Sequence, residues 1–238
     1  MAKFVPSLLL SALLLLMSVS VASAQDRVRE SRDVAAFTEV GFSVPGTLHL
    51  RQGDTRSVEV EASQKVLDHL ETAVDGDRLE IRDESNFFDR IFDGEGGAVE
   101  VYVTAPTIEA VAVAGSGTVV GETPIESSSL SLDNAGSGTI DLEVAASDLR
   151  IGIAGSGTLR LRGTADDVEV KIAGAGTVRA LDLTTKTVDV QVAGAGDTRL
   201  HVTEALEVKI MGSGDVVYRG SPSIDTSILG SGEVRSAE

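Results

Sequence analysis

Apolar and polar residues alternate along most of this chain. Between Leu149 and Gly163 every odd position is apolar or glycine, whereas the even positions are polar or small. Alternation with a period of two is typical of β-strands with one buried face. It continues through a repeated five-residue motif, which reads AGSGT at 114–118, 135–139 and 154–158, AGAGT at 173–177, AGAGD at 193–197, MGSGD at 211–215 and LGSGE at 229–233.

The spacing of this motif predicts the architecture. Its first glycines are Gly115, Gly136, Gly155, Gly174, Gly194, Gly212 and Gly230, so successive copies are 18 to 21 residues apart. A fixed period in this range indicates a solenoid, in which each repeat forms one coil of a stacked core. A coil of about 20 residues holds two or three short strands, and neighbouring coils are about 4.8 Å apart. We therefore predict an all-β, single-stranded parallel β-helix, right-handed because crossovers between parallel strands usually are.

The motif glycines have the same parity as the apolar residues. Gly155 and Gly157 continue the odd-numbered series of Leu149, Ile151 and Ile153. We therefore expect both glycines to face the core at a bend, where side chains would crowd the inside of the corner. Asn134 occupies an inward position of the same pattern, and we expect its buried amide to form a ladder hydrogen bond rather than a binding site.

The N-terminal half follows the coil pattern less regularly. Phe42, Val44, Leu48 and Leu50 alternate as in a coil, and strands are predicted at 57–61, 79–81 and 98–104. The apolar residues Val66, Leu67 and Leu70 have helical spacing, which predicts a short helix over 64–72. Because a terminal coil exposes its core and its edge, this helix is our candidate cap.

Residues 1–24 resemble a signal peptide. They contain Lys3, an apolar run at 8–16 and an Ala22-Ser23-Ala24 cleavage site, and the apolar run is short for a membrane anchor, the alternative interpretation. The remaining chain is expected to be exported to the periplasm, the cell surface or the medium, without stable membrane insertion. Residues 25–36 are predicted to be a flexible leader, and 37–238 a single solenoid domain.

An insertion at 83–97 interrupts the repeats and contains Phe87, Phe88 and Phe92. These residues could form an exposed loop for a partner or a membrane surface. The alternative is a flap packed on the solenoid, which we favour because exposed apolar clusters are uncommon on soluble proteins.

The chain is strongly acidic, with a formal net charge of −17, and it contains no cysteine. Removing 1–24, which holds one base and no acid, makes the net charge −18. This charge argues against nucleic acid and anionic membranes as partners. The absence of cysteine excludes a disulfide framework and a lipid-modified cysteine.

The chain resembles the head GIN domain family, described as putative auto-transporter adhesin domains of exported bacterial proteins. The resemblance rests on the segments 37–40 (FTEV), 52–54 (QGD), 75–79 (DGDRL) and the repeated Gly-Ser-Gly motif. It covers nearly all of the chain after the signal segment. It implies a parallel β-helix with an adhesive role, and it supplies no catalytic residues.

No catalytic or metal-binding motif stands out in the sequence. His49, His69 and His201 lack zinc-ligand spacing, and the glycines form neither a nucleophile elbow nor a phosphate-binding loop. The alternative function is that of a polysaccharide lyase or hydrolase on a β-helix, which would need converging carboxylates in a cleft. We identify no such pair. The chain has no tryptophan and two tyrosines, so it has few aromatic side chains on which a sugar ring could stack. We therefore favour a non-catalytic envelope or surface module without a cofactor.

The outward residues of the motif are small and uncharged over four coils. Stacked coils would arrange them as one flat strip, about three residues wide, on an otherwise charged surface. We expect this strip to bind an envelope protein or a glycan, or a second copy of the chain; the alternative is that small residues are simply what a tight bend permits. The strip consists of Ala114, Ser116, Thr118, Ala135, Ser137, Thr139, Ala154, Ser156, Thr158, Ala173, Ala175 and Thr177.

The last motif position becomes acidic in the final three copies. Asp197, Asp215 and Glu233 would stack at about 4.8 Å, where like charges repel. A calcium ion could offset this repulsion, so these residues are a candidate metal site. We favour a solvated negative strip that discourages further stacking, since surface carboxylates are usually hydrated.

Overall fold

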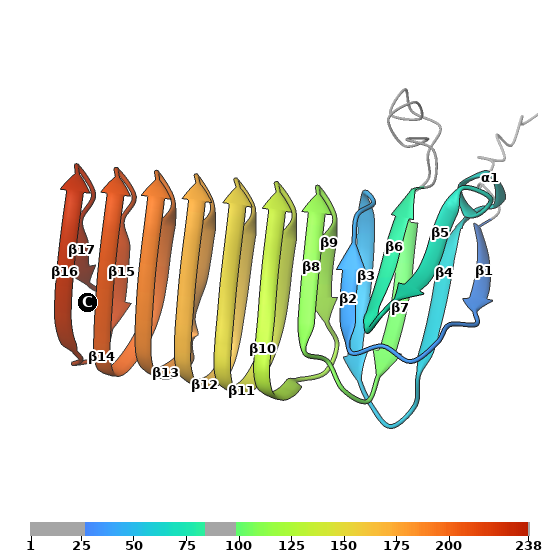
Figure 1. Ribbon diagram of the computed structural model, residues 1–238, viewed down its shortest axis with the longest axis horizontal. Coiled ribbons are helices and arrows are strands. Elements are labelled where there is room, and N and C mark those ends of the chain that lie inside the picture. The colour runs from blue at the N-terminus through green and yellow to red at the C-terminus, as the bar shows by residue number, and fades with distance from the viewer. Residues whose placement is uncertain (1–26, 84–98, 238) are drawn as a thin grey trace, which may run out of the picture.

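The computed structural model describes residues 27–83 and 99–237. The predicted signal segment 1–24 and the phenylalanines Phe87, Phe88 and Phe92 lie outside the described residues. The described chain is an elongated stack of coils of about seven turns, with about 19 residues in each coil (Figure 1). The predicted all-β parallel solenoid is therefore confirmed.

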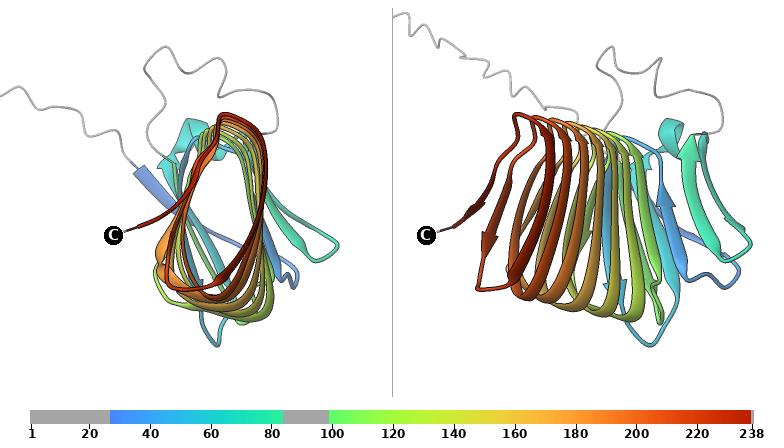
Figure 2. Two further views of the ribbon diagram at one scale, coloured as in Figure 1. Left: turned by 90° about the vertical axis from the view of Figure 1, so that its left-hand side faces the viewer. Right: turned by 60° about the vertical axis from the view of Figure 1, so that its left-hand side comes forward.

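The repeats form long strands that run from one motif to the next. Each long strand bends midway and pairs in parallel with the coils before and after it. The end view shows a flattened oval with two broad faces (Figure 2). The strands of this part are β8 (Ala110–Gly115), β9 (Thr118–Gly121), β10 (Ile125–Gly136), β11 (Thr139–Gly155), β12 (Thr158–Gly174), β13 (Thr177–Gly194), β14 (Asp197–Gly212), β15 (Val216–Arg219), β16 (Ser223–Gly230) and β17 (Val234–Ser236).

Alternating burial explains why the repeats stack. Leu149 of β11 pairs with Val168 of β12, which pairs with Val188 of β13 and through it with Leu206 of β14. All four side chains are buried, so each apolar column continues through successive coils. Burying such a side chain contributes about 1.5–3 kcal/mol. Repeating the same residue types at the same positions therefore keeps the coils in register.

The two glycines of each motif have different surroundings. Gly157 is buried, and a β-carbon there would collide with the Asn134 side chain, so its predicted inward position is confirmed. The prediction is wrong for the first glycine. Gly155 has φ = +125°, and a β-carbon there would lie 2.5 Å from the carbonyl oxygen of Gly136 in the preceding coil. The turned backbone directs this position at the neighbouring coil rather than into the core.

Asn134 is buried, as the sequence predicted, but it does not form the predicted ladder hydrogen bond. Its side chain is 1% exposed, and its Nδ2 donates a hydrogen bond to the carbonyl oxygen of Gly138 at 2.8 Å. The bond spans the turn of its own coil and does not link two coils. Its Oδ1 has no hydrogen-bond partner among the described residues.

The N-terminal end extends both faces of the solenoid and then stops parallel stacking. On one face β3 and β7 continue the parallel order, followed by antiparallel β4 and β1; on the other, β2 and β6 are followed by antiparallel β5. These strands are β1 (Arg27–Arg32), β2 (Glu39–Phe42), β3 (Gly46–Gln52), β4 (Ser57–Ser63), β5 (Leu70–Asp75), β6 (Arg78–Asp83) and β7 (Val99–Ala105).

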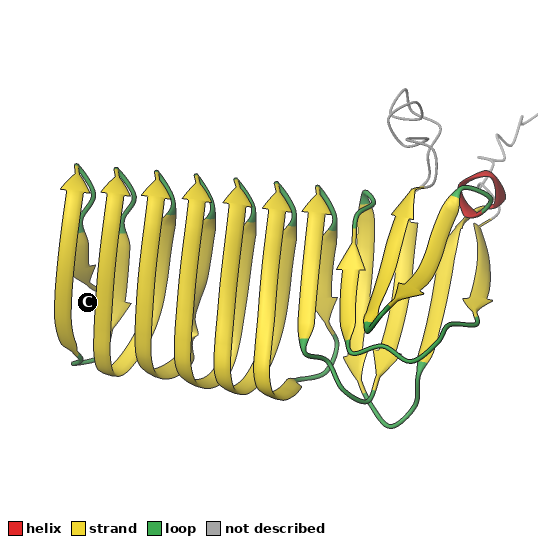
Figure 3. Ribbon diagram, viewed as in Figure 1, coloured by secondary structure: helices red, strands yellow, loops and turns green. Residues whose placement is uncertain are grey.

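Two predictions for this end are corrected. Within the predicted flexible leader 25–36, residues Arg27–Arg32 form strand β1, because an unpaired edge of β4 is available to them. The helix predicted over 64–72 is only α1 (Gln64–Leu67), and Leu70 begins strand β5 (Figure 3). Short apolar runs do not distinguish a helix from a strand by spacing alone. Antiparallel strands thus form the end structure that the sequence assigned to a helix.

None of the described strands covers the C-terminal end in a comparable way. β16 pairs only with β14, and β17 only with β15, so their outer edges have no partner among the described strands. Ile224 and Ile228 continue the inward columns of Leu206 and Ile210. Because no further coil among the described residues covers them, they are 43% and 41% exposed.

Candidate functional site

The small residues of the predicted strip stack as the repeat implied. Ala114, Ala135, Ala154 and Ala173 pair in register on successive coils, and all four are exposed. The threonines at the end of the motif form a second column and are partly buried: Thr118, Thr139, Thr158 and Thr177. Between these columns the backbone N–H of Ser156 donates to the carbonyl oxygen of Gly136 at 2.8 Å, and equivalent bonds recur along the stack. The surface of the bend is therefore rigidly spaced.

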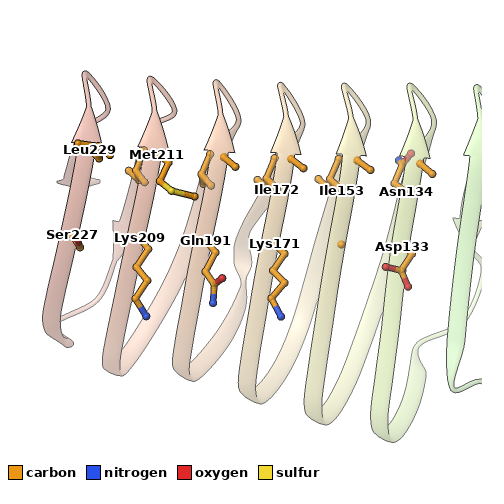
Figure 4. Close-up of a pocket in the computed structure, with 17 residues that line it drawn as sticks. Asp133, Asn134, Ile153, Lys171, Ile172, Gln191, Lys209, Met211, Ser227 and Leu229 are labelled. Carbon is orange, nitrogen blue, oxygen red and sulfur yellow. The ribbon is translucent and has the colours of Figure 1, made fainter.

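A groove of about 630 Å³ runs beside the alanine column on the outer face of the solenoid (Figure 4). Ala135, Ala154, Ala173 and Ala193 line it, so it shares three residues with the strip. Because these side chains are single methyl groups, a bound molecule could closely approach the sheet there. The sequence reasoning found the alanines but not the depression beside them.

Longer side chains form the borders of this groove. Lys171, Gln191 and Lys209 pair in register and lie side by side along one border. At the C-terminal end Met211 and Leu229 replace the alanine of the motif, and they are 62% and 75% exposed. The signal for these residues was present in the sequence as the MGSGD and LGSGE variants of the motif.

The lysines of the border are held by neighbouring acids. Lys171 forms an ion pair with Glu169, and Lys209 with Glu207. The hydrogen bond that Lys209 donates to Glu207, together with the negative charge of Glu207, raises the pKa of Lys209 above its usual value. The border therefore presents charges that are already partly neutralised beside an apolar floor. Among the described residues, Asp133 is the one carboxylate that lines the groove, so these residues do not form there the carboxylate pair that a glycosidase uses.

A row of arginines lies on the other broad face, after the glycine bend. Arg160 pairs in register with Arg179, and Arg179 with Arg199. All three side chains are exposed. Sequence reasoning missed this row, although each arginine follows the second glycine of its motif by three positions. Aligning the repeats on that glycine would have found it.

The acidic residues at the end of the motif stack as predicted. The N–H of Asp215 donates to Asp197 Oδ1 at 3.3 Å, and the N–H of Glu233 to Asp215 Oδ1 at 3.0 Å. These carboxylates thus bond to the backbone of the next coil. Within residues 27–83 and 99–237, no group of three or more histidine, cysteine, aspartate or glutamate side chains could hold a metal ion.

The three histidines lie in separate places, on β3, after α1 and on β14. His49 forms contacts that the sequence did not suggest. Its Nε2 lies 2.9 Å from Glu100 Oε2, its Nδ1 lies 3.4 Å from Glu122 Oε1, and its ring stacks on Tyr102 at 4.7 Å between centroids. Arg29 covers the same Tyr102 ring at 4.1 Å. This cluster binds β1, β3 and β7 together at the N-terminal end.

The described residues contain no helix long and apolar enough to cross a membrane. Residues 36–222 match the family model described as "Putative auto-transporter adhesin, head GIN domain". No curated protein matched the chain.

Several solved structures share the fold. A putative adhesin from Bacteroides fragilis has a TM-score of 0.80 at 21% identity, and a putative lipid binding protein from Parabacteroides distasonis has 0.73 at 22%. A putative adhesin from Parabacteroides merdae has 0.69 at 15%. Each of these alignments covers 90% of this chain and 98% of the other.

Proposed function

The chain belongs to the head GIN domain family of putative auto-transporter adhesins, and we propose that it is a non-catalytic, exported surface module that holds an envelope protein partner. The observation that carries this proposal is the uncharged strip with its adjoining groove, in a chain of net charge −17. A partner that approaches there displaces little bound water from charged groups. The family description supports export and adhesion, and the groove beside the strip supports a contact on this face.

The shape of the groove favours an elongated apolar segment of a partner protein as its occupant. Its alanine floor extends over four coils, and the exposed Met211 and Leu229 enlarge the apolar area at one end. Exposed apolar patches beside polar borders are typical of binding surfaces. Gln191 and the two lysines of the border could hydrogen-bond the polar groups of an extended peptide. A relative of 22% identity is described as a putative lipid binding protein, so an acyl chain is the competing occupant.

Paired substitutions test the surface. Ala154→Arg with Ala173→Arg places two long cations on the floor, on β11 and β12. The matched control is Ala145→Arg with Thr164→Arg, which are exposed and in register on the same two strands near the opposite corner. Labelled protein is incubated with bacterial envelope vesicles, before and after protease treatment, and with protein-free vesicles of the same lipids.

We expect wild type and control to bind untreated vesicles, and the floor variant to lose most of that binding. Equal binding by the floor variant and the control would contradict the proposal. Binding that survives protease treatment, or that occurs on protein-free vesicles, would mean that the partner is a lipid and not a protein.

The open C-terminal end supports self-association as a second candidate. Met211, Ile224, Ile228 and Leu229 are the large apolar side chains exposed in the described chain, and all four lie in its final coils. Residues 216–238 carry two arginines and three acids, so this end is nearly neutral within an acidic chain. At the other end, by contrast, edge strand β1 reads RVRESR, and charged edges discourage strand addition.

We propose that two C-terminal ends pair through antiparallel β16 strands about a twofold axis at Thr226. Symmetric dimers use the same surface twice, and this centre places Ile224 opposite Ile228 of the second copy, with Asp225 opposite Ser227. Opposite residues of an antiparallel pair lie on one face, so the apolar residues would remain on the inner side.

The absence of cysteine makes this pairing simple to test. Thr226→Cys should form a disulfide-linked dimer under mild oxidation, since directly opposite residues come within disulfide reach. Ala145→Cys, far from this end, should not, and Ile228→Lys should reduce the mass in solution to that of the monomer. A monomeric wild type, or equal cross-linking of both cysteine variants, would contradict the pairing.

A further inference from the structure

The arginine row differs from those basic residues of the coils that have a carboxylate partner. Arg162 forms ion pairs with Asp141 and Glu143, Lys186 pairs with Asp166, and both groove lysines have a carboxylate. In the described part of the chain, by contrast, no carboxylate lies within ion-pair distance of Arg160, Arg179 or Arg199. Three neighbouring positions are thus cationic and unneutralised in a protein with almost twice as many acids as bases.

Two acids that lie beside the row on the sheet have other partners. Asp141 pairs in register with Arg160, but its carboxylate bonds to Arg162 at 2.8 Å. Asp197 precedes Arg199 by two residues on the same strand, but its Oδ1 accepts the N–H of Asp215. The guanidinium groups of the row are therefore free to bind an anion from outside.

Stacking these arginines opposes folding. Register neighbours on adjacent strands are about 4.8 Å apart, and like charges directly opposite each other are destabilising. An external anion that contacts several guanidinium groups would relieve this repulsion. The anion must be extended, because the row follows the solenoid axis over three coils.

The chemistry of the row selects among extended anions. Guanidinium groups form forked hydrogen bonds to carboxylate and other oxyanions. Single-stranded nucleic acid is usually held by aromatic stacking as well. The described residues contain two tyrosines: Tyr102 is covered by His49 and Arg29, and Tyr218 packs against the core. The row thus offers charge recognition without stacking.

We propose that Arg160, Arg179 and Arg199 form a binding row for an acidic polysaccharide that carries a carboxylate or sulfate on successive sugars. One guanidinium per coil would meet one charged group after another along the sugar chain. The row and the groove lie on opposite sides of the glycine bend, so this binding is independent of the proposed protein contact. It goes beyond that proposal, because it adds a glycan to the surfaces that an adhesin of this family could hold.

The test measures binding of defined polymers by calorimetry at low and at physiological salt. The probes are polygalacturonate, which carries carboxylates, heparin, which carries mainly sulfates, neutral dextran and a thymidine oligonucleotide. The variant is Arg160→Gln, Arg179→Gln and Arg199→Gln together. The control Lys171→Gln, Lys186→Gln and Lys209→Gln removes the same number of positive charges from residues that already have carboxylate partners.

We expect wild type and the lysine control to bind one of the acidic polysaccharides, with an affinity that falls as salt rises. The arginine variant should bind it roughly tenfold more weakly or worse, because charge-assisted hydrogen bonds are lost. Polygalacturonate and heparin then distinguish carboxylate from sulfate recognition. No binding by wild type at low salt, equal losses in both triple variants, or tighter binding of the oligonucleotide would overturn the proposal.

Discussion

Gly155 packs directly against the backbone of Gly136 in the preceding coil. The Gly136 carbonyl oxygen would lie 2.5 Å from a β-carbon added to Gly155. The same relationship recurs between Gly174 and Gly155, where the distance would be 2.6 Å. The first glycine of the motif therefore lets the backbones of adjacent coils approach closely, and the second keeps side chains out of the inside of the corner. This close backbone approach lets the Ser156 N–H reach the Gly136 oxygen.

Gly155→Ala should lower the free energy of unfolding by roughly 1–3 kcal/mol, because it combines a strained positive φ with a backbone collision. Ser156→Ala is the control, because this exposed neighbour keeps the backbone bond. Urea unfolding followed by circular dichroism measures both. A loss at Gly155 no larger than that at Ser156 would show that the coils can separate without cost.

Asn134→Val should leave stability unchanged or raise it by about 1 kcal/mol. Asn134 lies in register between Val113 and Ile153, so a β-branched side chain fits its column. Its buried Oδ1 lacks a partner, and such a group costs about 1–3 kcal/mol. The Gly138 oxygen would keep its bond from the Thr158 N–H at 2.9 Å.

Thermal and urea unfolding of this variant would decide the point. A clear loss of stability would mean that the turn depends on the Asn134 amide.

Removing β1 should destabilise the N-terminal end and promote aggregation. β1 pairs with the edge of β4 along six residues, and Arg29 contributes an ion pair to Glu59 and a contact with the Tyr102 ring. A protein that starts at residue 34 would expose the β4 edge to other molecules. Light scattering during heating should show earlier association than in a protein that starts at residue 25. If both proteins associated at the same temperature, residues 25–36 would act as the flexible leader that the sequence predicted.

Glu71 should titrate below the usual glutamate range. The hydrogen bond from Arg82 lowers its pKa, and the positive charge of Arg82 acts in the same direction. Because the folded-state pKa is depressed, any stabilisation from this pair is present above the unfolded pKa. It is lost as pH falls through the folded value.

NMR titration of the Glu71 carboxyl carbon measures this pKa. Arg82→Gln should raise it toward 4.5, the ordinary value, while the other glutamates keep theirs. An unchanged pKa would mean that the contact with Arg82 is not maintained in solution.

Sequence reasoning predicted the repeating part well because each coil carries the same signal. Alternation of Leu159 and Leu161 with exposed arginines, repeated at a near-constant period, leaves one way to bury the apolar face. The N-terminal end carries no repeat, so the spacing of Leu67 and Leu70 suited both a helix and a strand. The pairing of β1 with β4 depends on contacts between residues 26 or more positions apart, which alternation does not encode.

The surfaces were predictable to different degrees. The alanine strip follows directly from the motif, whereas the groove depends on the side chains that border it, such as Lys171 and Met211. The arginine row was readable from the repeat alignment, but its lack of carboxylate partners requires the structure. The first-glycine error arose because parity gives the direction of a side chain only where the backbone stays extended. At φ = +125° it does not.

Site-specific photo-cross-linking measures most directly whether the groove floor contacts a partner protein. A photoreactive side chain is placed at Ala173, on the floor, or at the exposed Thr164 on the same strand, and each protein is irradiated on bacterial envelope vesicles. The account predicts a discrete protein adduct from Ala173 and none from Thr164. An adduct from Thr164 alone, or the same adducts from both positions, would contradict it.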